Sequence, residues 1–341
     1  MPAVSRSTLP IGELFVLGFR GYAVPRWLEN FAARFGLGGV ILFDYDVQTR
    51  LYERNVRDPA QVKALCAEVA ALPSGPLVFV DQEGGRVRRL KERLGFSPLP
   101  SARAFGALPP TERASLAQRA FTELRALGIH YDLAPVIDLD YDPASPDIGA
   151  LERSFGADPL VVRENVRLLD TAAREARIGL CLKHYPGLGA ARVNSHEELT
   201  DLTGTVTEAQ LRLFHELAGD IHGGAVLVSH GIVAEWEPKV PASLSSAALG
   251  RLRRAAPEAL LVSDDLQMQG LQRFCTTEMA LRRGFSAGLD VLLMGNNLLD
   301  ESTQMAALAK GLAGTVAGDP ALSAAFEASL ERIRARKALL S

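Results

Sequence analysis

Short apolar runs recur along the chain, and glycine or polar residues follow each of them. The eight runs occupy residues 14–17, 39–43, 77–80, 131–134, 178–182, 225–228, 260–262 and 291–294. Charged, amphipathic stretches separate many of them, at residues 58–71, 111–127, 158–177, 207–222 and 276–288. Near-continuous apolar strands that alternate with helical patterns are typical of a parallel sheet buried on both faces. Eight such units predict an α/β protein with a single (β/α)8 TIM-type barrel.

A doubly wound open sheet is the competing architecture. It usually has fewer strands and a glycine-rich phosphate turn after the first one. The first run here is followed by Gly18-Phe19-Arg20-Gly21, which is not a dinucleotide-binding fingerprint. No break in composition marks a linker, so we expect one barrel domain over residues 1–341.

Composition and charge narrow the class of protein. Of the 341 residues 48% are hydrophobic and 23% are charged, with a net charge of −3, which is ordinary for a folded globular protein. The densest basic run spans residues 86–93 and has acidic residues within and beside it, so we expect no nucleic-acid partner. No apolar run reaches the roughly 20 residues that a membrane span needs. We therefore expect no membrane partner. Because no large exposed apolar stripe is evident in the sequence, we also expect a monomer.

The cysteines indicate a cellular compartment. Cys66, Cys181 and Cys275 are far apart, odd in number, and form no CxxC pair. This usage argues against a disulfide framework or a structural zinc site. Free thiols and an N-terminus without a signal-peptide pattern lead us to expect a cytoplasmic protein.

Polar residues follow six of the eight predicted strands. In a barrel, the chemistry gathers at the carboxyl ends of the strands. Charged groups that directly follow buried strands are costly unless they are paired or used, so six such ends predict a pocket for a sugar or another small molecule. The segments are 81–86, 138 with 152–156, 183–187 with 194–196, 229–231, 263–265 and 295–297.

Three chemistries are open at this point. His184, His196 and His230 lie on separate loops with no HxH or HExxH pattern, so a metal site would need them to converge by folding. Lys183 at a strand end is a candidate Schiff-base lysine. Asp264 follows a fully apolar strand and is a candidate carboxylate nucleophile. Alternatively, Ser263 or Asp264 caps the next helix, and the doubled aspartate allows one residue for each role.

The residues resemble glycoside hydrolase family 3, in its bacterial β-N-acetylhexosaminidase branch, which includes the N-acetylglucosaminidase of peptidoglycan recycling. That family has Lys-His-Phe/Ile-Pro-Gly-His/Leu-Gly and, four residues later, Asp-Ser/Thr-His. This chain has Lys183-His184-Tyr185-Pro186-Gly187-Leu188-Gly189 and Asn194-Ser195-His196 at the same spacing. The family's Asp-Gln-Glu-Gly-Gly-Arg-Val, Arg-Ser-Phe-Gly and Ser-Asp-Asp-Leu blocks stand at residues 81–87, 153–156 and 263–266. The resemblance covers residues 12–296, and we expect no second, sandwich domain of the kind that many relatives have.

The resemblance implies a retaining exo-β-N-acetylglucosaminidase acting on cell-wall-derived glycans. Asp264 would form a covalent glycosyl intermediate, and His196 would act as acid and then as base. We expect no cofactor and no metal. The residues implied to bind the sugar are Asp81, Arg89, Arg153, Lys183 and His184. The alternatives are structural ion pairs for Arg89 and Arg153 and a histidine packed under the sugar site for His184.

Asn194 departs from the family, which has an aspartate two residues before the catalytic histidine. An amide oxygen accepts a hydrogen bond but carries no charge to stabilise an imidazolium. Glu197, Glu198 or Asp201 would supply the missing charge, or His196 would work without it, or the protein would be a weakly active or inactive sugar-binding relative. A same-family β-glycosidase and a glycoside phosphorylase are further alternatives.

Overall fold

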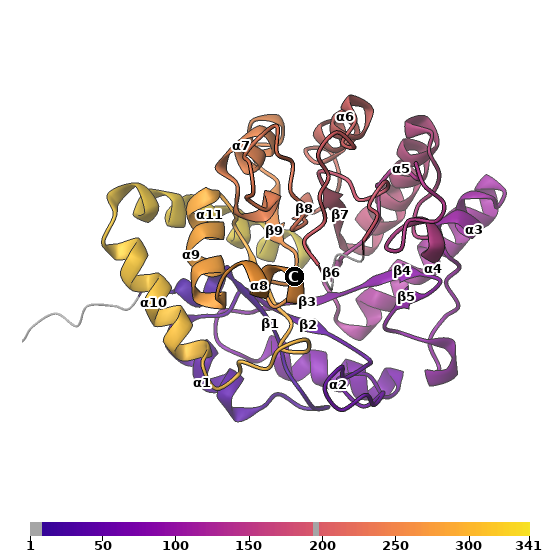
Figure 1. Cartoon of the computed structure of the whole chain (residues 1–341). Coiled ribbons are helices and arrows are strands. Elements are labelled where there is room, and N and C mark those ends of the chain that lie inside the picture. Colours follow the sequence, from indigo (N-terminus) through magenta and orange to yellow (C-terminus); the bar gives the residue numbers. More distant parts are fainter. Residues whose placement is uncertain (1–8, 194–197) are drawn as a thin grey trace, which may run out of the picture.

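The computed structural model describes residues 9–193 and 198–341, and its eight main strands form one parallel sheet that closes on itself (Figure 1). The spatial order of these strands is β10-β1-β2-β3-β6-β7-β8-β9. A parallel bridge between Val262 and Val291 joins the β9 and β10 sides and completes the ring. The predicted (β/α)8 barrel is confirmed. The strands of the ring are β1 Phe15–Gly18, β2 Gly39–Leu42, β3 Leu77–Val80, β6 Tyr131–Asp132, β7 Gly179–Tyr185, β8 Ala225–Val228, β9 Leu260–Ser263 and β10 Leu292–Met294.

Helices surround this ring (Figure 1). Three of them, α2, α5 and α11, begin at the proline of an Asp-Pro pair. The side chains of Asp58, Asp158 and Asp319 each accept a backbone N–H of the first turn, and the proline that follows has no N–H to satisfy. The α-helices are α1 Arg26–Phe35, α2 Pro59–Ala70, α3 Ala102–Gly106, α4 Pro110–Leu127, α5 Pro159–Ala176, α6 Glu208–Leu217, α7 Ser246–Ala255, α8 Gln269–Phe274, α9 Thr277–Ala287, α10 Met305–Ala317 and α11 Pro320–Leu340. The short 3-10 helices are η1 Ile11–Leu14, η2 Glu92–Leu94, η3 Gly149–Leu151 and η4 Ala242–Leu244.

Two large aromatic rings fill part of the sheet core. Phe79 on β3 stacks on Tyr131 on β6 with ring centroids 4.8 Å apart, and both side chains are buried. Gly39 and Gly179 leave the space for them, because a Cβ at either position would lie 2.5 Å from the neighbouring ring. The Tyr131 hydroxyl donates to the Gly223 carbonyl, so its polar end is satisfied within the core.

Two strand predictions need adjustment, and both concern the functional end of the barrel. β7 continues through Lys183 and His184 to Tyr185, so these two residues lie within the strand rather than after it. β6 ends at Asp132, and Pro135, which has no N–H to donate, follows shortly after. A small antiparallel hairpin that the apolar pattern does not show, β4 Gln82–Gly84 with β5 Val87–Arg88, follows β3.

Among the described residues, no helix has both the length and the apolar character needed to cross a membrane.

Candidate active site

Polar residues from five of the six predicted strand-end segments line one cavity at the carboxyl end of the barrel, and the sixth segment, 229–231, is not part of its described lining. The volume of the cavity is about 460 Å³. Its wall includes residues of β2, the β4–β5 hairpin, β7, β8 and β10, and residues that directly follow β3, β9 and β10. The charged and polar side chains among those that line it are Asp81, Glu83, Arg89, Asp147, Arg153, Lys183, His184, Asp264, Asp265 and Asn297. All five predicted sugar-binding residues and the predicted nucleophile therefore lie around the same space.

Buried ion pairs connect the β3 and β7 sides of this cavity. Lys183 Nζ lies 2.8 Å from Asp81 Oδ1 and 2.6 Å from Glu83 Oε1. Arg89 Nη2 lies 2.9 Å from the second oxygen of Asp81. Arg153 donates to both oxygens of Glu83, at 2.8 Å each, in the two-pronged geometry that suits a carboxylate. The two carboxylates and three cations thus form a single network.

The network controls the protonation of its members. Burial disfavours the ionised form of Asp81, but Lys183 and Arg89 outweigh it and hold the pKa of that carboxyl below its usual range. Burial likewise opposes ionisation of Glu83, and Arg153 and Lys183 lower its pKa to about 2. These carboxylates remain charged across the physiological range and can accept hydrogen bonds from sugar hydroxyls.

Lys183 is a poor candidate for Schiff-base chemistry. Burial alone would lower the pKa of its amine, but Asp81 and Glu83 outweigh that effect and raise the pKa above its usual value. A Schiff-base lysine needs the opposite shift, because only the neutral amine is a nucleophile. The geometry favours a binding role for Lys183.

His184 connects two site residues. Its Nδ1 lies 2.7 Å from Asp138 Oδ2, and its Nε2 lies 3.0 Å from Arg153 Nη2. A guanidinium only donates, so Nε2 accepts and the Nδ1 proton is donated to Asp138. Asp138 also accepts the backbone N–H groups of His184 and Leu188. His184 thereby fixes the orientation of Arg153, and both residues line the cavity.

Asp264 stands at the end of β9 on the opposite side of the cavity. Its N–H donates to the Val228 carbonyl, and its Oδ1 accepts the N–H of Asp265 at 2.8 Å. Asp265 Oδ1 accepts N–H groups from Gln267 and Gly295 at 3.0 and 3.2 Å. Burial raises the pKa of Asp265 to about 7, and the charge of Asp264 adds to the effect.

The alternative that Ser263 or an aspartate caps the next helix is wrong. Helix α8 begins at Gln269, and its N-cap residue is Met268, whose side chain makes no capping bond. Asp264 and Asp265 both line the cavity instead. Asp265 reaches the turn before the helix, where it accepts the N–H of Gln267.

Asn194, His196 and Glu197 lie outside the described residues, so their assignments stay predictions. Of the other residues expected to supply a charge near His196, Glu198 is exposed. Asp201 is also exposed and accepts the N–H of Thr203 at 2.9 Å. Neither belongs to the described residues that line the cavity.

Three further carboxylates belong to the site, although the sequence analysis gave none of them a role: Glu83 and Asp138 were noted only as polar residues after strands, and Asp147 was not noted. Glu83 could have been inferred, because it lies two positions after Asp81 on an extended segment and so faces the same side. Asp138 pairs with a histidine 46 positions away, and Asp147 lines the cavity from the loop before η3. Its place after the fourth predicted strand marks Asp138 as polar but not its partner, and no local pattern marks Asp147.

The described residues contain no group of three or more His, Cys, Asp and Glu side chains arranged to hold a metal ion. His184 and His230, two of the histidines considered for such a site, have protein partners. The ring nitrogens of His230 lie 2.7 Å from Ser243 Oγ and 3.0 Å from the Asp265 carbonyl oxygen.

Comparison with solved structures relates this arrangement to known enzymes. The chain superimposes with a TM-score of 0.86 and 26% identity on a glycoside hydrolase family 3 β-N-acetylglucosaminidase from Paenibacillus sp.. The match covers 99% of this chain but only 64% of that protein. A β-N-acetylhexosaminidase from Beutenbergia cavernae gives a TM-score of 0.83 at 25% identity, covering 99% of this chain and all of that one.

Sequence relatives agree with the structural ones. A beta-hexosaminidase of Thiobacillus denitrificans is 35% identical over 280 residues, which cover 78% of this chain and 74% of that protein. A beta-hexosaminidase of Pseudomonas aeruginosa is 33% identical over 285 residues, covering 80% and 79%. The family model for the glycosyl hydrolase family 3 N-terminal domain matches residues 11–335. The resemblance seen in the motifs is therefore confirmed, and the chain belongs to glycoside hydrolase family 3.

Proposed function

We propose that the protein is a retaining exo-β-N-acetylglucosaminidase that removes N-acetylglucosamine from cell-wall-derived glycans. The observation that carries the proposal is the position of Asp264. Its carboxylate enters a polar cavity opposite the network of Asp81, Glu83, Lys183 and Arg153. A carboxylate facing fixed hydrogen-bonding groups across a sugar-sized space suits nucleophilic attack on an anomeric carbon.

The binding side would hold the hydroxyl groups of the sugar. The carboxylates of Asp81 and Glu83 accept hydrogen bonds, while Lys183, Arg89 and Arg153 donate them. Because each group is already held by a partner of opposite charge, little side-chain freedom is lost when the sugar binds. We assign the sugar-binding role to Asp81, Arg89, Arg153 and Lys183, with His184 fixing Arg153.

The reaction would proceed in two displacements. Asp264 attacks the anomeric carbon and forms a glycosyl ester, while the bond to the leaving oxygen breaks and His196 protonates that oxygen. Water then attacks the ester with His196 taking its proton, which releases the sugar with retained configuration and restores Asp264. An imidazole suits both steps because its ordinary pKa is near 7.

The direct test uses 4-nitrophenyl N-acetyl-β-D-glucosaminide beside the corresponding β-glucoside. Nitrophenol release from the first substrate, lost in Asp264→Asn, is the expected result. Release from the glucoside alone would contradict the proposed substrate. Silence on both, with N-acetylglucosamine still bound, would replace the proposal with a sugar-binding role.

Asn194 supports a second candidate, a glycoside phosphorylase of the same family. Where the family has aspartate, this residue puts an uncharged amide two positions before His196. One fewer negative charge near the reaction centre would repel incoming phosphate less. Adding phosphate to the assay and looking for a sugar 1-phosphate separates the two reactions.

We also expect Asn194→Asp to raise the rate of hydrolysis of the aryl N-acetylglucosaminide. An unchanged or lower rate would show that Asn194 does not limit His196.

A further inference from the structure

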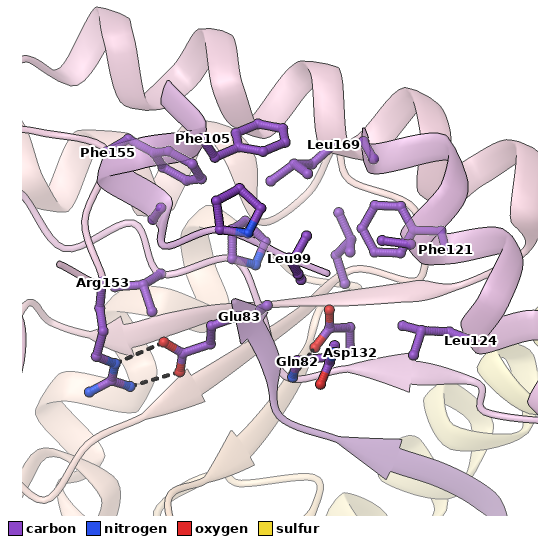
Figure 2. Close-up of a pocket in the computed structure, with 18 residues that line it drawn as sticks. Gln82, Glu83, Leu99, Phe105, Phe121, Leu124, Asp132, Arg153, Phe155 and Leu169 are labelled. Atoms are coloured by element: carbon purple, nitrogen blue, oxygen red, sulfur yellow. Dashed lines mark hydrogen bonds and ion pairs between the residues drawn. The ribbon is translucent and has the colours of Figure 1, made fainter. Parts of the chain in front are cut away.

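A second cavity lies directly behind the sugar site. It lies between the sheet and the surrounding helices, has a volume of about 40 Å³, and is shown in Figure 2. Glu83 and Arg153 line both this cavity and the sugar cavity, so their ion pair forms part of the wall between the two. Most of the remaining lining is apolar, including Leu99, Phe105, Phe121, Leu124, Phe155 and Leu169.

Asp132 and Gln82 are the two other polar residues that line this cavity. Asp132 is the last residue of β6, and only 3% of it is exposed. One carboxylate oxygen accepts the Gln82 N–H at 2.9 Å, and the other points into the cavity (Figure 2). A carboxyl group in such a place costs stability unless it makes a bond that the fold needs.

The hydrogen bond from the Gln82 N–H to Asp132 takes the place of a backbone hydrogen bond between strands. Pairing between β3 and β6 ends with Val80 opposite Asp132, so the chain beyond Val80 leaves the ladder. The N–H of Gln82 is buried there, and a buried N–H requires an acceptor. The Asp132 side chain supplies that acceptor at the point where the polar site begins.

The side chain of Gln82 in turn holds the far end of the β4–β5 hairpin through three hydrogen bonds. Its Oε1 accepts the N–H groups of Arg89 and Leu90, each at 3.0 Å. Its Nε2 donates to the Leu90 carbonyl, also at 3.0 Å. A single buried glutamine, fixed on Asp132, therefore holds both ends of the segment that runs from residue 82 to residue 90.

We propose that Asp132 is a positioning residue for the sugar site, acting through Gln82 on Asp81, Glu83 and Arg89. Asp81 and Glu83 flank Gln82, so a fixed Gln82 sets how both carboxylates meet Lys183. Arg89 follows from the other end of the hairpin, where Gln82 holds its N–H. Only the identity of the ligand rests on the proposed function; the anchoring is a property of the fold.

The surroundings of Asp132 separate the effect of its charge from the effect of its acceptor oxygen. Asp81 and Glu83 face it from the β3–β4 segment and Lys183 faces it from β7, while the α3, α4 and α5 residues that line the cavity are apolar. Burial raises the pKa of Asp132 to about 7. The charges of Asp81 and Glu83 add to this increase, whereas the Gln82 N–H and Lys183 oppose it. An asparagine keeps an acceptor oxygen without charge, whereas an alanine removes both.

The experiment compares Asp132→Ala, Asp132→Asn and the control Leu124→Ala. Leu124 is apolar, 1% exposed and lines the same cavity, so its truncation opens space without removing an acceptor. Hydrogen exchange of segment 81–90 is measured by mass spectrometry, and N-acetylglucosamine affinity is measured by calorimetry. In Asp132→Ala we expect exchange of this segment to accelerate, and affinity to fall, by about tenfold or more. We expect Asp132→Asn to rescue both, and Leu124→Ala to leave segment 81–90 protected.

Two results would overturn the proposal: unchanged protection of segment 81–90 in Asp132→Ala, or the same loss of protection in Leu124→Ala. If the wild-type protein binds no N-acetylglucosamine while segment 81–90 still responds selectively, the proposed function fails and the positioning role stands. If the alanine variant does not fold, Asp132→Ser, which shortens the side chain but keeps it polar, takes its place in the same comparison.

Discussion

The β3–β7 side of the barrel mouth holds its charges in pairs, whereas the β9 side presents two adjacent carboxylates bonded to main-chain N–H groups. On the first side, Asp81 and Glu83 each contact two cations. On the second, within the described residues, the side chain of Asp264 accepts one hydrogen bond, from Asp265 N. Paired charges are rigid and suit the binding of a neutral polyol, while a carboxylate without a bound cation keeps its nucleophilic oxygen available.

The largest expected effect comes from the β9 side. Asp264→Asn keeps the shape of the side chain and removes the nucleophile, so we expect kcat for the aryl N-acetylglucosaminide to fall at least about 10³-fold. Sugar affinity should change little, because the ion-paired residues on the β3–β7 side, called the paired side below, are unchanged. Asp265→Asn is the matched control, one residue along the same segment. Equal losses in the two variants would contradict the division of roles between the two aspartates.

Next in size is the loss of the central cation on the paired side. Lys183 is 3% exposed and contacts both Asp81 and Glu83, so Lys183→Met leaves two buried carboxylates short of a partner. We expect the free energy of unfolding at pH 7, measured in urea, to fall by about 3–5 kcal/mol. The control is Arg212→Met, which breaks a pair exposed by 63% and 85%, with an expected change below about 0.5 kcal/mol. Similar values for both would mean that the buried network does not stabilise the fold.

The apolar periodicity located all eight strands of the ring within a few residues, and β3 and β8 have the predicted bounds. Buried parallel strands show themselves in a single sequence because both their faces are apolar. The motifs likewise placed Asp81, Lys183 and Asp264 around one cavity. This much follows from local sequence and chain order.

The partners of these residues could not be predicted in the same way. Asp138 meets His184 across 46 positions, and Asp132 meets Gln82 across 50. Such contacts depend on which side chains turn inward at neighbouring strands. The β4–β5 hairpin carries Glu83 and leads to Arg89. It is too short and too polar to produce an alternation of apolar and polar residues, so the sequence pattern did not predict it.

A pH experiment sharpens the comparison from the β9 side. Asp265 has a pKa of about 7 in the folded protein, against about 3.9 for an unperturbed aspartate. Because the folded state holds the proton more tightly, its stabilising effect is complete below about pH 4 and is lost as the pH rises to 7. Relative to Asp265→Asn, the wild type should lose roughly 3 kcal/mol of unfolding free energy between pH 4 and pH 7. Urea unfolding across this range measures the difference, and parallel curves for the two proteins would contradict the raised pKa.

The smallest expected effect on stability is that of Arg89→Met. It compares the partly exposed edge of the paired side, where Arg89 lies, with its interior, where Lys183 lies. Arg89 and Lys183 contact the same carboxylate, Asp81, but the Arg89 side chain is 25% exposed and that of Lys183 only 3%. In Arg89→Met, Asp81 keeps its bond to Lys183, so no buried charge loses its last partner. We expect the free energy of unfolding to fall by less than about 1 kcal/mol, and calorimetry to show a severalfold weaker affinity for N-acetylglucosamine because one donor is lost. A loss of stability as large as that of Lys183→Met would mean that the exposed pair of Arg89 and Asp81 stabilises the fold as much as the interior pairs do. No loss of affinity would instead make Arg89 a structural partner of Asp81, leaving the binding of the sugar to the interior of the network.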